Sequence, residues 1–224
     1  MIVGLCEYKD KQGEIMVRTF GLEEGFQAYA HRVWTGGVDL FFNREDELKA
    51  FLDRYGDFVY TVGRDELEAV VGRMLKERGI KLAVAESCSG GLLSARIVNV
   101  PGASEYFIGG FVVYANELKT KLLSVGEEAL GKYGAVSEEV CRQMALGALE
   151  ETDADITLAI TGISGPSGGT KDKPVGLTYI GLATDKEVLV KKVLLQGDRN
   201  ENRFKATQWA LEILRRYLLG RLQW

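Results

Sequence analysis

The stretch from Glu86 to Gly91, Glu-Ser-Cys-Ser-Gly-Gly, holds the side chains best suited to chemistry in this sequence. A short apolar run precedes it and a helical pattern follows, so we predict a strand, a tight turn and a helix. A serine in such a turn exposes its hydroxyl, and backbone N–H groups nearby can stabilise an oxyanion. Ser87 is therefore a candidate nucleophile. The alternatives are that Ser87 and Ser89 only cap the helix, and that Cys88 is either a second nucleophile or a small buried residue.

A serine nucleophile needs a base, and the only histidine, His31, is far from this turn in the sequence. A Ser-His-Asp triad or a multi-histidine zinc site is therefore not expected unless His31 folds back onto the turn. Lys119 follows a predicted strand and can act as a base if burial lowers its pKa, although a solvated helix lysine is the alternative. We predict no cofactor and no metal site, since the sequence offers no histidine cluster or clear carboxylate cage.

A second group of small polar residues follows the apolar run 154–161. The loop that follows is rich in Gly and Ser, and the backbone N–H groups of Gly162 to Gly169 could hold a phosphate, with a flexible surface loop as the alternative. It is not a Walker loop, because no Gly-Lys-[Ser/Thr] follows. Arg199 and Arg203 open the last predicted helix, where positive charge opposes the helix dipole, and this position favours a functional role.

These candidates lie on segments that alternate between strand and helix, followed by one hairpin. We therefore predict an α/β domain at residues 63–224, in a three-layer α/β/α arrangement with a mixed sheet. Both polar segments follow strands, and such sheets bind ligands beyond the carboxyl ends of their strands. The predicted strands are 81–86, 107–114, 154–161, 175–184 and 187–195. The predicted helices are 65–78, 90–98, 117–123, one capped by Ser137, and one that includes 206–218.

Residues 1–62 are predicted to form a separate small α+β module. Strands are expected at 14–20, 38–42 and 57–62, with a short helix at 25–33 and a longer one at 44–55. A module of about 60 residues buries little surface and is marginally stable alone.

Composition narrows the classes of protein. Of the 224 residues, 46% are hydrophobic, which is enough for a core, and the net charge is −4, whereas nucleic-acid binders are usually basic. No apolar run approaches the roughly 18 residues of a membrane helix, and the first residues lack the pattern of a secretory signal. The three cysteines are isolated from one another, which suits a reducing compartment. We expect a cytoplasmic protein that binds neither nucleic acid nor membrane.

The serine turn also resembles a known signature. Residues 85–91, Ala-Glu-Ser-Cys-Ser-Gly-Gly, are similar to the A-E-S-C-T-G-G motif of the CinA C-terminal domain family, the nicotinamide-nucleotide amidases. Ser89 replaces the usual threonine and keeps the hydroxyl. The resemblance covers about residues 65–219. Further matches follow in order at 100–104, 110–114 with Lys119, 134–137, 161–166, 168–169, 173–176 and 197–199.

The resemblance implies a Ser/Lys amidohydrolase that converts nicotinamide mononucleotide to nicotinate mononucleotide and ammonia, without a metal. Matched by motif, Ser87 would be the nucleophile, Lys119 the base, and Ser104 a relay that passes the proton between them. The turn and oxyanion residues would be Ser89, Gly90 and Gly91. The residues expected to bind or orient the substrate are Tyr114, Thr161, Gly162, Ser164, and Arg199 or Arg203, between which the motif does not choose.

The remaining expectations also come from this resemblance. Residues 18–25, Arg-Thr-Phe-Gly-Leu-Glu-Glu-Gly, resemble the start of the KH-like middle module of longer family members, so residues 1–62 are expected to be a remnant of that module. They contain no Gly-x-x-Gly clamp in a basic setting for RNA. The family implies a homodimer or higher homo-oligomer whose partner is the small nucleotide substrate. A non-catalytic CinA-like module that binds nucleotides is the alternative, and the intact set Ser87, Ser104 and Lys119 favours the enzyme.

Overall fold

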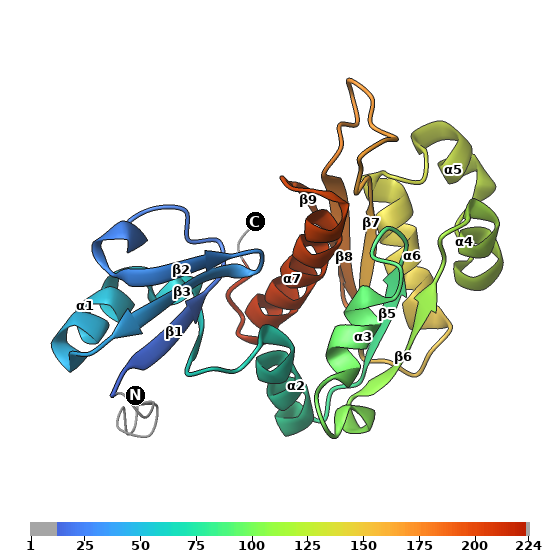
Figure 1. The fold of residues 1–224 in the computed structure, drawn as a ribbon. Helices are drawn as coiled ribbons and strands as arrows, with labels where there is room; N and C mark the ends of the chain where they lie inside the picture. The colour runs from blue at the N-terminus through green and yellow to red at the C-terminus, as the bar shows by residue number, and fades with distance from the viewer. Residues whose placement is uncertain (1–12, 223–224) are drawn as a thin grey trace. The chain divides into compact units, whose positions relative to one another are not determined.

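A computed structural model of the chain describes residues 13–222. The chain divides into two compact units, residues 1–70 and residues 71–224 (Figure 1). The strands and helices, in chain order, are β1 (Ile15–Thr19), β2 (Ala30–Trp34), β3 (Gly37–Phe42), α1 (Glu45–Tyr55), β4 (Val59–Val62), α2 (Leu67–Arg78), β5 (Leu82–Glu86), α3 (Leu92–Val98), β6 (Phe107–Val112), α4 (Asn116–Leu123), α5 (Glu127–Tyr133), α6 (Glu138–Glu150), β7 (Ile156–Gly162), β8 (Leu177–Thr184), β9 (Val188–Leu194) and α7 (Arg199–Leu218).

The first unit is a four-stranded antiparallel sheet in the order β2-β3-β1-β4, with α1 packed on it. Ile15, Leu40 and Phe51 belong to its buried cluster. The predicted small α+β module is therefore present, but the helix predicted at 25–33 is wrong. Only one 3₁₀ turn, Phe26–Ala28, forms there, because the residues that follow it pair with β3 as strand β2.

The first unit extends past the boundary expected after residue 62. Arg18 is almost fully buried, and its Nη1 donates to the carbonyl oxygens of Arg64 and Asp65, each at 3.3 Å. The same guanidinium pairs with Glu66 at 2.6 Å. These bonds hold residues 64–66 to the first sheet. The chain divides after Val70, within α2.

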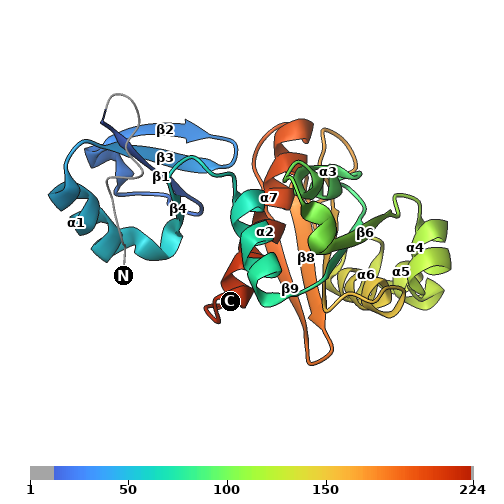
Figure 2. The same cartoon turned by 90° about the horizontal axis from the view of Figure 1, so that it is seen from below.

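The second unit is built on a five-stranded sheet in the order β6-β5-β7-β8-β9. β5 runs parallel to β6 and β7, whereas β8 and β9 form the predicted antiparallel hairpin. Helix α6 packs on one face of the sheet, and α3 and α7 cover the other (Figures 1 and 2). This arrangement confirms the predicted three-layer α/β/α fold with a mixed sheet.

Helices α4 and α5 pack beside α6. The sequence patterns predict α4 but not α5, on which Ala129 is the only buried residue. One buried residue makes no repeating apolar stripe.

The contact between α4 and α6 depends on Gly147. A Cβ atom at this position would lie 2.0 Å from the carbonyl oxygen and 2.7 Å from the carbonyl carbon of Leu123, the last residue of α4. Because a side chain of any size would collide with this backbone, glycine allows the two helices their close approach. Gly147 therefore helps to fix α4, the helix that carries Lys119.

We expect Gly147→Ala to lower the free energy of unfolding by about 1–3 kcal/mol, because the new methyl group must push α4 away from α6. Gly131→Ala in α5 is the matched control, since nothing lies within 4 Å of a Cβ built there. Removing that glycine should stabilise the protein by about 0.4–1 kcal/mol. Urea unfolding of both variants measures the difference, and equal effects would contradict this account of the helix contact.

Candidate active site

Ser87 follows β5 directly, at the carboxyl end of a strand whose five residues are all buried. Its N–H donates to the carbonyl oxygen of Ile160 at 2.9 Å, which continues the pairing between β5 and β7. The chain then turns sharply, because the Gly90 N–H donates back to the Ser87 carbonyl at 3.1 Å. Gly90 and Gly91 have φ values of 62° and 89°, a region that glycine adopts without strain.

The carboxylate of Glu86, and not the hydroxyl of Ser87 or Ser89, accepts hydrogen bonds from the first turn of α3. One Glu86 oxygen accepts from the Leu93 N–H at 3.0 Å, and the other accepts from the Ser94 N–H at 2.8 Å and the Ser94 hydroxyl at 2.7 Å. The glycine before α3 offers no side-chain cap. Capping by the two serines is therefore wrong. Local patterns gave no signal for Glu86, because it lies within a strand and its carboxylate is fully buried.

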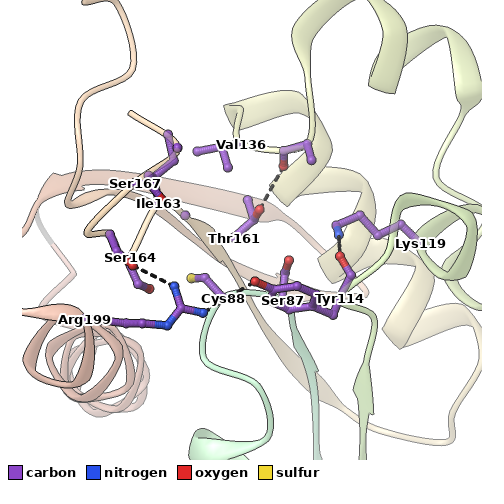
Figure 3. Close-up of a pocket in the computed structure, with 14 residues that line it drawn as sticks. Ser87, Cys88, Tyr114, Lys119, Val136, Thr161, Ile163, Ser164, Ser167 and Arg199 are labelled. Carbon is purple, nitrogen blue, oxygen red and sulfur yellow. Dashed lines mark hydrogen bonds between the residues drawn. The ribbon is translucent and has the colours of Figure 1, made fainter. Parts of the chain in front are cut away.

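A cavity of about 230 Å³ opens where β5 and β7 end (Figure 3). The serine turn, the segment after β6, α4, the connection between α5 and α6, the Gly/Ser loop and the start of α7 contribute to it. Its position agrees with ligand binding beyond the carboxyl ends of strands. The residues that line it are Ser87, Cys88, Tyr114, Lys119, Ala135, Val136, Thr161, Gly162, Ile163, Ser164, Gly165, Ser167, Gly168 and Arg199.

Lys119 is nearly fully buried in the wall of this cavity, with 1% of its surface exposed. Its Nζ donates to the carbonyl oxygen of Val113 at 2.8 Å. It also donates to that of Tyr114 at 3.0 Å (Figure 3). Burial lowers the pKa of Lys119 below its ordinary value, and the nearby Cys88 and Glu117 oppose this shift. A neutral amine has two hydrogens, which the two carbonyls can accept, and its lone pair is then available to take a proton.

Cys88 lines the same cavity but is a poor nucleophile. Burial raises the pKa of its thiol to about 11, although a hydrogen bond with Ser164 acts in the opposite direction. At neutral pH the sulfur is therefore a thiol, and the thiolate is the reactive form. Between the two interpretations of Cys88, the structure favours a small buried residue.

The two arginines of α7 have different positions. Arg199 lines the cavity, and its Nη1 donates to the Gly165 carbonyl at 2.7 Å, while its Nη2 lies 3.5 Å from the Tyr114 hydroxyl (Figure 3). Arg203 instead donates to the Ser89 carbonyl oxygen, from Nη2 at 2.8 Å and from Nε at 3.2 Å. Arg199 is therefore placed to meet a ligand, and Arg203 holds the serine turn.

Thr161, Gly162 and Ser164 all line the cavity, but their side chains play different parts. Thr161 is fully buried, and its hydroxyl donates to the Ala135 carbonyl at 2.8 Å, so it supports the wall. A Cβ at Gly162 would lie 2.6 Å from the Thr178 hydroxyl oxygen, which leaves little room for a side chain there. Ser164 is buried beside Cys88.

The structure does not bring Ser104 to the cavity. Ser104 is exposed in the turn before β6, and β6 runs parallel to β5 with Leu82 opposite Phe107. Ser104 therefore lies at the amino edge of the sheet, and Ser87 lies at the carboxyl edge, about 16 Å away along the strands. The predicted relay from Ser87 through Ser104 to Lys119 is wrong within a single chain. The order of motifs along the chain does not show at which edge of the sheet a residue lies, because that depends on the direction of the strands.

Three of the predicted turn residues form the turn without lining the cavity: Ser89, Gly90 and Gly91. His31 lies on β2 of the first unit, where it is exposed. Among residues 13–222, no group of three or more His, Cys, Asp and Glu side chains is arranged to hold a metal ion. The same described residues include no helix that is both long and apolar enough to span a membrane.

Residues 64–218 match the family described as the CinA C-terminal domain. The chain belongs to the CinA C-terminal domain family. A CinA-like protein of Kosmotoga olearia is 47% identical over 171 residues, which are 76% of this chain and 42% of that protein. A CinA-like protein of Thermotoga maritima is 49% identical over 177 residues, or 79% of this chain and 43% of that protein. The chain thus spans less than half the length of these relatives.

Solved structures of the CinA family share the fold of the second unit. A CinA superfamily protein from Klebsiella pneumoniae superposes with a TM-score of 0.67 and 31% identity, over 69% of this chain and 96% of that one. The competence/damage inducible protein CihA from Agrobacterium tumefaciens gives a TM-score of 0.65 and 35% identity, over 69% and 97% of the two chains. The match to these CinA-family structures supports the family assignment that the sequence motifs indicated.

We expect Glu86→Gln to lower the free energy of unfolding by about 2–4 kcal/mol, because a neutral amide accepts from the N–H groups of α3 more weakly and adds a buried donor. Glu117→Gln in α4 is the control, since Glu117 is exposed. Denaturant unfolding measures both changes. Equal stability of Glu86→Gln and the wild-type protein would show that the carboxylate is not needed for this turn.

Proposed function

We propose that the chain is an amidohydrolase that converts nicotinamide mononucleotide and water to nicotinate mononucleotide and ammonia. One observation carries the proposal of a hydrolase: Ser87 and the buried amine of Lys119 line the same cavity. The choice of substrate is supported by the motifs shared with the family. The names of the relatives state no reaction.

In the proposed first step, the Ser87 hydroxyl attacks the carboxamide carbon, and its proton passes to Lys119, directly or through one water molecule. The C–N bond then breaks, and the lysine returns the proton to the departing ammonia. In the second step, water attacks the resulting ester, and Lys119 accepts the proton of the water and returns it to Ser87. Nicotinate mononucleotide is released, and the enzyme regains its starting state.

Arg199 and Tyr114 are the groups that we propose to orient the substrate. Both line the cavity and keep exposed surface, 60% in the case of Tyr114. A guanidinium has five N–H donors and a permanent positive charge, which suit the phosphate of a nucleotide. In this proposal Thr161 supports the cavity wall and does not bind the substrate, because its hydroxyl donates a hydrogen bond to the Ala135 carbonyl.

Release of ammonia from nicotinamide mononucleotide, measured by a coupled assay with the purified chain, tests the proposed reaction. We expect the wild-type protein to be active and Ser87→Ala to lose nearly all activity, because the hydroxyl that forms the ester is gone. Saturable binding of the nucleotide without ammonia release would instead favour a non-catalytic nucleotide-binding module.

Lys119→Arg should reduce kcat about 10²- to 10⁴-fold, as severely as Lys119→Ala, because arginine stays protonated in proteins. Substrate binding should change little, since the amine acts in the chemical step. Lys121→Arg, on an exposed position of the same helix, is the control and should be fully active. A kcat of about a tenth or more of the wild-type value in Lys119→Arg would exclude Lys119 as the base.

The pH profile gives an independent test of Lys119. A base must lose its proton before it can act, so kcat/KM should rise with pH through the pKa of Lys119 in the free enzyme. Because burial lowers this pKa, the rise should be centred below the ordinary lysine value of 10.5. A profile with no rising limb that belongs to Lys119 would contradict the assignment.

A further inference from the structure

The connection between α5 and α6 forms one wall of the cavity through Ala135 and Val136. Its backbone has few regular partners, because α5 ends at Tyr133 and α6 begins only at Glu138. Carbonyl oxygens in such a segment need donors from elsewhere.

Side chains supply those donors for four successive carbonyls. Ser137 Oγ donates to the Gly134 carbonyl at 2.9 Å, and Thr161 Oγ1 donates to the Ala135 carbonyl at 2.8 Å. The carbonyls on either side, of Tyr133 and Val136, both accept from Nζ of Lys173, at 2.5 Å and 2.7 Å.

Lys173 differs from the other two donors because it belongs to the loop that forms the opposite wall. Gly165, Ser167 and Gly168 of that loop line the cavity. The backbone of Lys173 is itself fixed, since its carbonyl accepts from the Thr170 N–H at 2.8 Å and its N–H donates to the Thr170 hydroxyl at 3.1 Å.

The geometry around Nζ fits a built contact. The ammonium sits at the carboxyl end of α5, where the helix dipole favours positive charge. A Cβ at Gly134 would lie 3.2 Å from Nζ, so the glycine leaves room for the lysine to approach. Gly134 has a φ of 75°, in the left-handed region that glycine favours.

We propose that Lys173 is a positioning residue that joins the two walls of the cavity and so sets the fit of the substrate. The bridge between the walls stands on these contacts alone, whereas its effect on the substrate rests on the proposed amidase function. Lys173 touches neither Ser87 nor Lys119 among its hydrogen bonds, so its loss should weaken substrate binding more than the chemical step.

Kinetics with nicotinamide mononucleotide test this effect. Lys173→Met should raise KM about 10-fold and change kcat less than about threefold, with the pH of the rising limb unchanged. Lys171→Met is the matched control, because it removes the same charge from an exposed position of the same loop, and its KM should stay close to wild type. Lys173→Arg should restore most of the affinity, since a guanidinium can also donate to two carbonyls. Equal KM values for Lys173→Met and Lys171→Met would overturn the proposal.

Hydrogen exchange followed by mass spectrometry tests the bridge without any reaction. Peptides that cover residues 134–140 should exchange about 10-fold faster in Lys173→Met than in the wild type or in Lys171→Met. If the wild type releases no ammonia but this exchange rises, the proposed function fails and the bridge stands. Unchanged exchange in Lys173→Met overturns the bridge, whatever the enzyme assay shows.

Discussion

The burial of the Lys119 amine is the constraint on which the cavity depends. A protonated amine without water is costly, and the pKa of Lys119 falls for this reason. The carbonyls of Val113 and Tyr114 compensate by accepting its hydrogens, so the segment after β6 must lie against α4. α4 in turn reaches this position because Gly147 lets it approach α6. A buried amine with a lowered pKa is thus a property of three packed elements, the segment after β6, α4 and α6.

The turn with Ser87 is stabilised from both sides of its backbone. Glu86, fully buried, accepts the first N–H groups of α3, and Arg203 donates to the Ser89 carbonyl. Arg199 lies one helical turn before Arg203 on α7 and faces the cavity. The same helix therefore holds the turn that carries Ser87 and places a cation at the cavity. Changes in the packing of α7 would affect both.

Long and regular segments were predicted well. The continuous apolar run of β7 corresponds closely to the observed strand, and α6 begins after Ser137, the residue predicted to cap it. Two short segments were not: residues 25–33 form a 3₁₀ turn and part of strand β2, and α5 was missed. Short segments carry too few residues for a clear period, so their structure follows from the neighbours with which they pair.

The sequence by itself determined the family, the layered α/β class, and the residue types of the site, because local patterns and motifs follow from neighbouring positions along the chain. Only the tertiary structure decided which of those residues meet. In it, Ser104 and Ser87 lie at opposite edges of the sheet. Arg199, and not Arg203, lines the cavity. The Thr161 hydroxyl is hydrogen-bonded to the cavity wall. The physical reason is that long-range packing sets the direction of each strand, the order of the strands and the side of a helix that faces the cavity. The order of motifs along the chain carries no information on these arrangements.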